Sequence, residues 1–338
     1  MRKIKVAVIG VGYLGKFHAE KYADLPNVEL VGVVDVDKGR ADEVAAHLKT
    51  NAFYSHKDIL SRGKIDAVSI VVPTLLHHRI AKDFLAEGID VLLEKPMAST
   101  IEEANELIKE AKKTKGILQI GHLERFNAAV VAMDGIINNP LFIETHRLSA
   151  FPDRSTDVDV IHDVMIHDID IIMNFVKSDI ASVDAVGVPV ITDKVDIANA
   201  RLRFKNGCVA NVTASRVSKE RMRKIRLFQH DAYISIDYAH QKVAVFRKTH
   251  GKSGAIPHII EEDITIEKSD TLLEEIKSFL HCVVSRKPPL VSGIDGRRAL
   301  EVTQMIQESI VSSMQKAVSG GSAVFFCLLS TAYCLLYL

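Results

Sequence analysis

The chain has 338 residues, which favours two domains because a single hydrophobic core stops growing at ~250–300 residues. Hydrophobic residues make up 47% and charged residues 25%, an ordinary globular composition that argues against a disordered chain. Lysine plus arginine and aspartate plus glutamate number 43 each, so no net charge favours nucleic acid or a membrane surface as a partner.

Cysteine usage and the two chain ends bear on the compartment. The four cysteines lack metal-ligand spacing and form no disulfide framework, which favours a reducing compartment. The apolar run of "MRKIKVAVIG" is too short for a signal peptide, so we expect a cytoplasmic protein. Residues 317–338 form an uncharged, largely apolar tail, which could be a short membrane anchor, a docked segment or a stretch foreign to the domain. It carries no catalytic motif, and we expect it to be dispensable.

The first 120 residues alternate short strands rich in valine and isoleucine with amphipathic helical stretches. The strand patterns include "KVAVIG", "VELVGVVD", "DAVSIVVP" and "DVLLEKP", and helical patterns such as "TIEEANELIKEAKKTKG" separate them. This alternation predicts βαβ units in a parallel, doubly wound sheet, an α/β Rossmann domain over residues 1–122. Ligands of such sheets bind at the carboxyl ends of the strands.

The first strand-to-helix turn, "IGVGYLG", places Gly10, Gly12 and Gly15 in GxGxxG register. The three glycines permit a tight turn, close approach of a pyrophosphate, and close packing of helix on strand. Asp35 ends the next strand, twenty residues past Gly15, where a carboxylate accepts both adenosine ribose hydroxyls and repels a 2′-phosphate. We therefore predict that the cofactor is NAD rather than NADP.

The stretch "DVLLEKPMAS" carries an apolar strand into Glu94, Lys95 and Pro96. On the motif alone, two solvated charges at the end of a strand would explain this stretch as well as a ligand site would. Because the strand belongs to the nucleotide fold, its carboxyl end lies at the ligand crevice. We therefore expect Lys95 to point at the nicotinamide end of the cofactor and to hydrogen-bond a reacting hydroxyl or carbonyl.

The second half predicts a different architecture, a substrate and oligomerisation domain over residues 123–316. Stretches such as "LFIETHRLSAF", "DIANARLRF" and "KVAVFRK" are typical of antiparallel strands, and Asn206-Gly207 is a hairpin signal. Two helical stretches, residues 270–285 and 296–314, should close this domain. The basic run "RVSKERMRKIR" is either a solvated loop or, with Arg147 and Arg154, a source of ligands for a substrate phosphate.

Five motifs together resemble the glucose–fructose oxidoreductase, inositol 2-dehydrogenase and rhizopine-catabolism (Gfo/Idh/MocA) family. They are "VIGVGYLGKFHA", "VVPTLLHHRIA", "DVLLEKPMAS", "GHLERFN" and "DVMIHDID", and the resemblance covers roughly residues 3–315. The resemblance implies an N-terminal Rossmann domain and a C-terminal α/β domain built on a large, mostly antiparallel sheet. That sheet commonly forms the dimer or tetramer interface of the family, so we expect a homodimer or homotetramer.

The resemblance also assigns residues to the site. It implies that Lys95, His167 and Asp163 are catalytic, with Lys95 or His167 as the base and Asp170 following at the usual spacing. The cofactor-binding residues would be Gly10, Gly12, Tyr13, Leu14, Gly15, Asp35, Pro73, Thr74, His77, Glu94 and Lys95. The substrate-binding residues would be Arg125, Asn127, Arg147, Arg154, Asp163 and His167.

A metal site is the rival interpretation of "HDVMIHD". His162 and His167 are five residues apart, roughly 140° around a helix, and cannot chelate one ion. Asp163 with His167 alone supplies too few ligands, so we predict no metal.

The pattern as a whole predicts an NAD-dependent dehydrogenase of a sugar secondary alcohol. "GHLERFN" most resembles the nucleotide-sugar members, in particular UDP-N-acetylglucosamine 3-dehydrogenases, although Ala128 stands where proline is expected. One rival is a dehydrogenase of a free sugar or inositol. The other is a catalytically dead NAD-binding regulator, which should have lost the lysine or the histidine; this chain keeps both.

Overall fold

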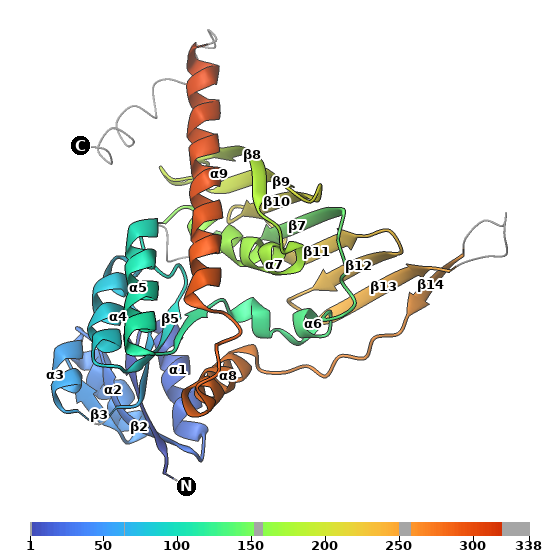
Figure 1. Ribbon diagram of the computed structural model, residues 1–338. Helices are drawn as coiled ribbons and strands as arrows, with labels where there is room; N and C mark the ends of the chain where they lie inside the picture. Colours follow the sequence, from blue (N-terminus) through green and yellow to red (C-terminus); the bar gives the residue numbers. More distant parts are fainter. Residues whose placement is uncertain (1, 64, 152–157, 250–257, 320–338) are drawn as a thin grey trace. The chain divides into compact units, whose positions relative to one another are not determined.

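Figure 1 shows the fold as a computed structural model, which describes residues 2–63, 65–151, 158–249 and 258–319. The chain divides into two compact units. The first comprises Met1–Asn127 and Lys268–Leu300, and the second comprises Ala128–Glu267 and Glu301–Leu338.

The first unit is built on six parallel strands in the order β3-β2-β1-β4-β5-β6, which is the doubly wound order of dinucleotide-binding domains. The predicted Rossmann fold is therefore confirmed. The strands are β1 (Ile4–Ile9), β2 (Val28–Val34), β3 (Asn51–Phe53), β4 (Ala67–Ile70), β5 (Asp90–Glu94) and β6 (Leu118–Gly121).

Helices cover both faces of this sheet, and each face has its own hydrophobic core. Alternate residues of one strand serve different faces: Ala7 and Ile9 pack with α4 and α5, whereas Val6 and Val8 pack with α1 and α8. The helices of the unit are α1 (Tyr13–Asp24), α2 (Lys38–Leu48), α3 (His56–Ser61), η1 (Thr74–Leu76), α4 (His77–Ala86), α5 (Ile101–Thr114), η2 (Leu123–Phe126) and α8 (Thr271–Ser285).

The start of α5 shows how local sequence sets a helix boundary. The Thr100 hydroxyl accepts a hydrogen bond from the Glu103 amide (3.2 Å), and the Glu103 carboxylate accepts one from the Ser99 amide (2.9 Å). This reciprocal pair satisfies two amides that the helix itself leaves without partners.

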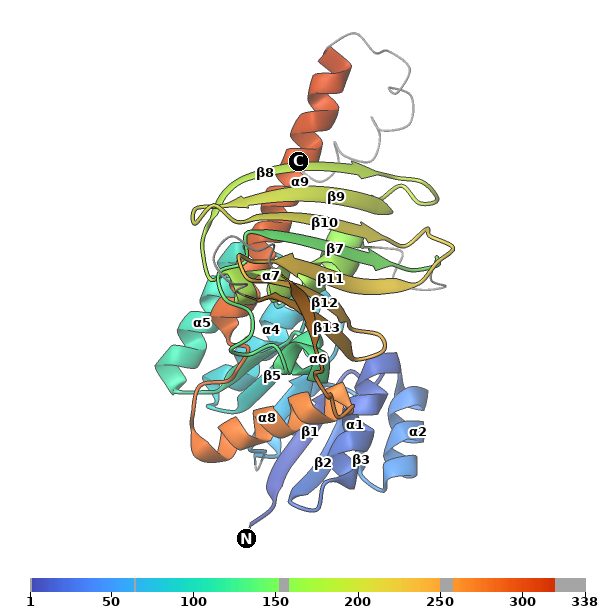
Figure 2. The ribbon, with the colours of Figure 1, turned by 90° about the vertical axis from the view of Figure 1, so that its right-hand side faces the viewer.

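The second unit is built on eight strands in the order β14-β13-β12-β11-β7-β10-β9-β8, which Figure 2 shows in sequence from β8 to β13. Only β7 and β10 pair in parallel, so the predicted large, mostly antiparallel sheet is confirmed. The strands are β7 (Phe142–Leu148), β8 (Ile180–Val188), β9 (Ile197–Phe204), β10 (Val209–Ser215), β11 (Met222–Phe228), β12 (Ala232–Asp237), β13 (Lys242–Lys248) and β14 (Ile259–Glu262).

The hairpin between β9 and β10 turns at Asn206-Gly207, as predicted, with Gly207 at a φ of +89°. One face of the sheet buries alanine, isoleucine, leucine and valine side chains of successive strands. The helical elements of this unit are α6 (Ala128–Val131), the π-helical turn η3 (Ile161–Met165), α7 (Ile166–Val176) and the long α9 (Gly293–Ser319), which continues from the first unit.

The division of the chain differs from the expected domains of residues 1–122 and 123–316, because residues 123–127 and 268–300 belong to the first unit. Both C-terminal helices were expected to close the second domain, yet α8 belongs to the first unit. Its apolar face explains this, because Ile276, Phe279 and Leu280 lie in the same core as Ala19 of α1.

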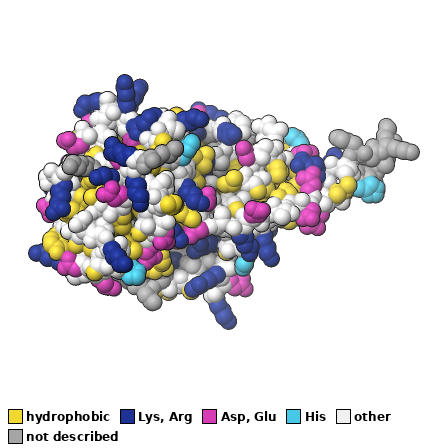
Figure 3. All heavy atoms as spheres, turned by 90° about the horizontal axis from the view of Figure 1, so that it is seen from below, with side chains coloured by type: hydrophobic (Ala, Val, Ile, Leu, Met, Phe, Trp, Pro, Cys, Tyr) yellow, Lys and Arg dark blue, Asp and Glu magenta, His cyan; other side chains and the backbone are white. Residues whose placement is uncertain are grey.

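The expected tail begins within the last turn of α9, and residues 320–338 lie outside the described residues. Within the described ranges, no helix is long and apolar enough to cross a membrane. On the face shown in Figure 3, basic and acidic side chains are interspersed, as the equal numbers of the two kinds of charge lead one to expect.

Candidate functional site

The glycine turn after β1 leaves an open space above the backbone. Gly10 has a φ of +86°, and a Cβ added there would lie 2.5 Å from the Val71 carbonyl oxygen. A Cβ at Gly15 would lie 1.9 Å from the Gly10 carbonyl oxygen, so this close approach of helix to strand requires glycine. At Gly12, in contrast, an added Cβ would meet nothing within 4 Å. Tyr13 and Leu14 then open α1 beside this space.

Asp35 follows β2 at the same edge of the sheet and is almost completely buried. Its carboxylate accepts hydrogen bonds from the amides of Val11 (3.0 Å) and Asp37 (2.9 Å). The carboxylate beside the glycine turn, together with the open space at Gly12, fits a dinucleotide. The glycines would face its pyrophosphate and Asp35 its adenosine ribose.

An arginine reaches this carboxylate, although none is adjacent to Asp35 in the sequence. Arg40, in the first turn of α2, places a guanidinium nitrogen 3.3 Å from the Asp35 carboxylate and another 3.2 Å from that of Asp37. Asp35 therefore neutralises a nearby cation, and the same carboxylate would present the acceptor for the ribose.

Exchange of Asp35 for alanine should weaken NAD binding about 10- to 100-fold, because hydrogen bonds to a charged group contribute about 1.5–3 kcal/mol. The same variant should bind NADP more tightly than the wild type does, since Arg40 loses a partner and can meet a 2′-phosphate. Fluorescence titration with both cofactors measures this. The double variant Asp35→Ala/Arg40→Ala is the control and should lose the gain in NADP affinity. Unchanged NAD affinity in Asp35→Ala would contradict the assignment.

The segment after β4 is tied to the segment after β5. Pro73 precedes the short helix η1, which begins at Thr74 and leads directly into α4 at His77. His77 is buried, and its ring nitrogens lie 2.8 Å from the carbonyl oxygens of Pro96 and Val72. Burial lowers the pKa of His77, while the two carbonyl contacts act in the opposite direction. The His77 ring therefore holds the backbone at Pro96, the residue that follows Lys95.

Glu94 and Lys95 occupy the end of β5, and the two side chains are in different environments. Glu94 ends the strand and is buried. Its carboxylate accepts a hydrogen bond from the Lys95 amide (3.2 Å) and lies 3.4 Å from Nε2 of His18. Lys95 follows the strand and is half-buried. Glu94 is thus a buried anion at the base of Lys95 rather than a solvated charge.

Arg125 and Asn127 lie in and just after η2, in the first unit, and both are buried. Arg125 lies 3.5 Å from the Asp295 carboxylate, and the Asn127 side-chain amide donates to Glu124 (3.1 Å). The structure therefore gathers the expected cofactor residues and these two side chains at one edge of the first unit, where β1, β2, β4, β5 and β6 end.

The other expected substrate residues lie in the second unit. Asp163 is in the turn η3, and His167 is in the first turn of α7. Arg147, on β7, is buried: its guanidinium donates to Asp168 (2.9 and 3.1 Å) and lies 5.4 Å from the Tyr238 ring centroid. These contacts favour a structural role for Arg147 over phosphate binding. Arg154 lies outside the described residues.

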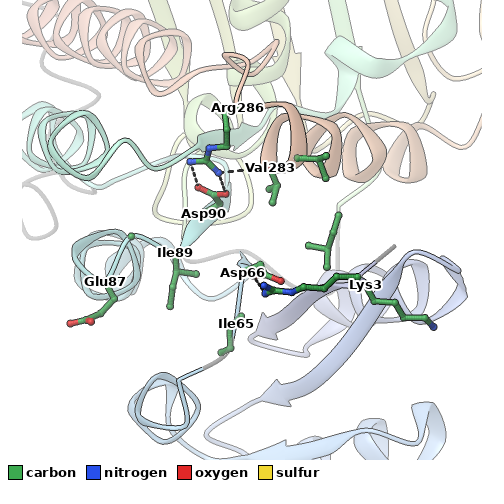
Figure 4. Close-up of a pocket in the computed structure, with 12 residues that line it drawn as sticks. Lys3, Ile65, Asp66, Glu87, Ile89, Asp90, Val283 and Arg286 are labelled. Atoms are coloured by element: carbon green, nitrogen blue, oxygen red, sulfur yellow. Dashed lines mark hydrogen bonds and ion pairs between the residues drawn. The ribbon is translucent and has the colours of Figure 1, made fainter.

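A separate cavity of about 390 Å³ lies at the opposite edge of the first sheet, where the strands begin (Figure 4). Two ion pairs lie among its lining residues: Arg286 contacts Asp90 (2.5 Å), and Arg2 contacts Asp66 (2.5 Å). Because ligands of doubly wound sheets bind at the carboxyl ends of the strands, we do not assign this cavity to the functional site.

Sequence reasoning missed three residues that the structure brings to the site: Arg40, His18 and Glu275. Arg40 carries no signal beyond its place in the first turn of α2. Glu275 does carry one, because it falls on the apolar face of α8 with Ile276 and Phe279, where an acid is unusual.

Comparison with known proteins agrees with the Rossmann fold of the first unit and with its expected binding of NAD. Residues 4–122 match the model of the GFO/IDH/MocA family, described as "Oxidoreductase family, NAD-binding Rossmann fold", and residues 129–235 match the "GFO/IDH/MocA C-terminal domain". The chain is 38% identical over 317 residues to UDP-N-acetylglucosamine 3-dehydrogenase of Acidithiobacillus ferrooxidans, covering 94% of this chain and all of that protein. It is 28% identical to scyllo-inositol 2-dehydrogenase (NAD(+)) of Bacillus subtilis, covering 89% and 92%.

Solved structures agree with this result. The crystal form P21 of UDP-N-acetylglucosamine 3-dehydrogenase GnnA from A. ferrooxidans superimposes with a TM-score of 0.87, covering 93% of this chain and all of that one. Fold and site together define an oxidoreductase with an NAD-binding Rossmann domain. The chain belongs to the GFO/IDH/MocA family. The resemblance drawn from the sequence motifs and the prediction of NAD as cofactor are confirmed.

Proposed function

We propose that the protein oxidises a secondary hydroxyl of a nucleotide sugar, namely the 3-hydroxyl of UDP-N-acetylglucosamine, with NAD as the hydride acceptor. The observation that carries the proposal is 38% identity to a UDP-N-acetylglucosamine 3-dehydrogenase along that enzyme's entire length. The inositol dehydrogenase of B. subtilis also matches most of this chain, but at 28% identity.

In this proposal the chemistry is divided between two side chains. Lys95 polarises the reacting oxygen, and His167 accepts the proton of the sugar hydroxyl, with Asp163 orienting the ring. When bound, NAD supplies the site that takes up hydride. The buried carboxylate of Glu94 and the tether at His77 support the assignment of Lys95, because both restrict the backbone that carries it.

The diphosphate handle needs charge-assisted donors. Since Arg147 is committed to Asp168, we assign this role to Arg154 and to Lys219 and Arg221 of the basic run. Lys219 and Arg221 are exposed between β10 and β11, and the Ser218 amide donates to the Ser149 carbonyl (2.9 Å). This bond ties the basic run to the residue that follows β7.

Removing the handle should cost at least about 100-fold in kcat/KM, since two charge-assisted hydrogen bonds contribute about 1.5–3 kcal/mol each. We therefore expect NADH production from UDP-N-acetylglucosamine and very little from free N-acetylglucosamine, glucose or inositol. The assay should be coupled to consumption of NADH or of the 3-keto product, because oxidation of an alcohol by NAD is often uphill.

Two outcomes of this assay would replace the proposal. Faster turnover of inositol or a free sugar than of any UDP-sugar would favour the free-sugar dehydrogenase. Tight NAD binding with no turnover of any of these substrates would favour the NAD-binding regulator.

We also propose that the open face of the second sheet joins copies of this chain into a homodimer or homotetramer. An aromatic row, Phe142, Phe228, Tyr233 and Phe246, runs across this face with neighbouring ring centroids 5.0–5.7 Å apart. Val186 and Val188 of β8 are exposed. Sedimentation equilibrium measures the oligomeric state.

A further inference from the structure

A buried polar cluster lies inside the first unit, on the face of the sheet that α1 and α8 cover. It comprises His18 of α1, Glu94 at the end of β5 and Glu275 of α8, from which one ring nitrogen and two carboxylate oxygens lie within 4.8 Å of one another. His18 and Glu275 are fully buried, and Glu94 is 8% exposed. Strand alternation explains the site, since Leu92 and therefore Glu94 face this side while Val91 and Leu93 face the other.

The two carboxyl groups cannot both be ionised here, because like charges at this separation in a water-excluded interior are strongly unfavourable. The surroundings decide which one keeps its proton. Both carboxyl oxygens of Glu275 are buried and accept no hydrogen bond from any donor in the described part of the chain. An ionised Glu275 would therefore be a buried charge with no donor to stabilise it.

Glu94 has the opposite surroundings. Burial acts to raise its pKa, but the contact with His18, whose Nε2 lies 3.4 Å away, together with the charge and amide of Lys95, outweighs burial and holds the pKa below its ordinary value. For Glu275, burial raises the pKa well above its ordinary value, and the Glu94 charge raises it further. Glu94 is thus the ionised member of the pair.

The backbone leaves room for this arrangement. A Cβ added at Gly121, the partner of Glu94 across β5 and β6, would lie 2.8 Å from a Glu94 carboxylate oxygen. The other ring nitrogen of His18 lies 3.3 Å from the Ser69 hydroxyl, which in turn lies 2.8 Å from the Tyr22 hydroxyl. The groups facing the carboxyl pair are therefore His18 and Tyr22 of α1, Ser69 of β4, and Lys95.

We propose that Glu275 is a positioning residue that carries a proton at neutral pH and donates it in a hydrogen bond to the carboxylate of Glu94. With Glu275 on one side and His18 on the other, the Glu94 carboxylate stays ionised and fixed beside the backbone of Lys95. The link to turnover rests on the proposed role of Lys95, whereas the protonation of Glu275 is independent of it.

Infrared spectroscopy of the full chain in D₂O tests the protonation directly. We expect a carbonyl band of a protonated carboxylic acid at pH 7 that disappears in Glu275→Gln. The matched control is Glu274→Gln, whose carboxylate is exposed and paired with Lys277 (2.8 Å), and which should leave the band unchanged. Absence of any band that depends on Glu275 would overturn the proposal.

A bound divalent cation is the other chemistry that one imidazole and two carboxylates could serve. Elemental analysis of the purified wild type distinguishes it. Metal at one equivalent per chain, lost in Glu275→Gln, would overturn the proposal, because a coordinated carboxylate carries no proton.

The pH profile of turnover tests the coupling to Lys95. Glu275→Leu removes the donor to Glu94, so the acid limb of kcat/KM should move up by about one to two pH units. The shift is upward because Glu94, without this donor, takes up a proton at a higher pH. The activity that depends on the Glu94 charge is therefore lost at a higher pH than in the wild type. Glu275→Gln, which still donates an N–H, should keep the wild-type limb. An equal shift in both variants would overturn the positioning role.

These experiments separate this inference from the proposed function. If Lys95→Met retains turnover while the Glu275 band is present, the role of Lys95 is wrong and the protonated Glu275 stands. If Glu275→Leu does not fold, the infrared comparison with Glu275→Gln still decides the protonation.

Discussion

Replacing Lys95 with methionine is expected to slow turnover by ~10²–10⁴-fold, the range that a positioned proton donor or acceptor contributes. Methionine has a similar length and no charge, so the variant removes the ammonium group while it retains most of the packing. NAD affinity should survive, because the glycine turn and Asp35 are unaffected. Steady-state kinetics with UDP-N-acetylglucosamine and an NAD titration measure the two effects separately.

Lys113→Met is the matched control for this variant. Lys113 lies on α5 with a 71% exposed side chain, and its contact with Glu110 is a surface pair of the kind that contributes little to stability. It should behave as the wild type. Near-wild-type turnover in Lys95→Met would reject the assignment, and a parallel loss of NAD binding would show that Lys95 serves the cofactor instead.

His167→Ala is expected to lose a similar ~10²–10⁴-fold in turnover and, unlike Lys95→Met, to regain part of it when free imidazole is added. A base must be deprotonated to act, so the wild-type rate should rise with pH and this rise should be lost in the variant. Kinetics over a pH series, with and without imidazole, measure both effects.

His162 supplies the control within the same helical segment. Its Nδ1 atom lies 2.9 Å from the Asp159 carboxylate, which commits the ring to a local pair in the second unit. His162→Gln should therefore keep its turnover. If imidazole restores Lys95→Met rather than His167→Ala, the base is Lys95 and the two roles must be exchanged.

Local sequence patterns were sufficient for most of the first unit. The positions of Gly10, Asp35 and Lys95 follow from strands that end in a glycine turn or a charge, and parallel strands necessarily bring those ends to one edge. The hairpin at Asn206-Gly207 was predictable from its turn residues, since glycine readily adopts the positive φ that Gly207 has in this turn.

Contacts between residues far apart in the sequence were not predictable in this way. The cluster of His18, Glu94 and Glu275 depends on three elements that meet only in the folded unit. Arg147 is a second example: its sequence position suggested a phosphate ligand, and the sequence did not indicate that its guanidinium donates to Asp168 and lies over the Tyr238 ring. Periodicity identifies which face of an element is buried and does not identify what covers it.

The return of Lys268–Leu300 to the first unit has a consequence for synthesis on the ribosome. The nucleotide-binding domain is complete only when residue 300 has emerged, about 170 residues after Asn127, which at ~5–20 residues per second is a delay of roughly 10–35 seconds. Throughout that interval the apolar surface that Ile276 and Phe279 later cover faces the solvent or a chaperone. A nascent chain stalled near residue 130 should therefore be protease-sensitive, and excision at that point should not yield a stable NAD-binding fragment.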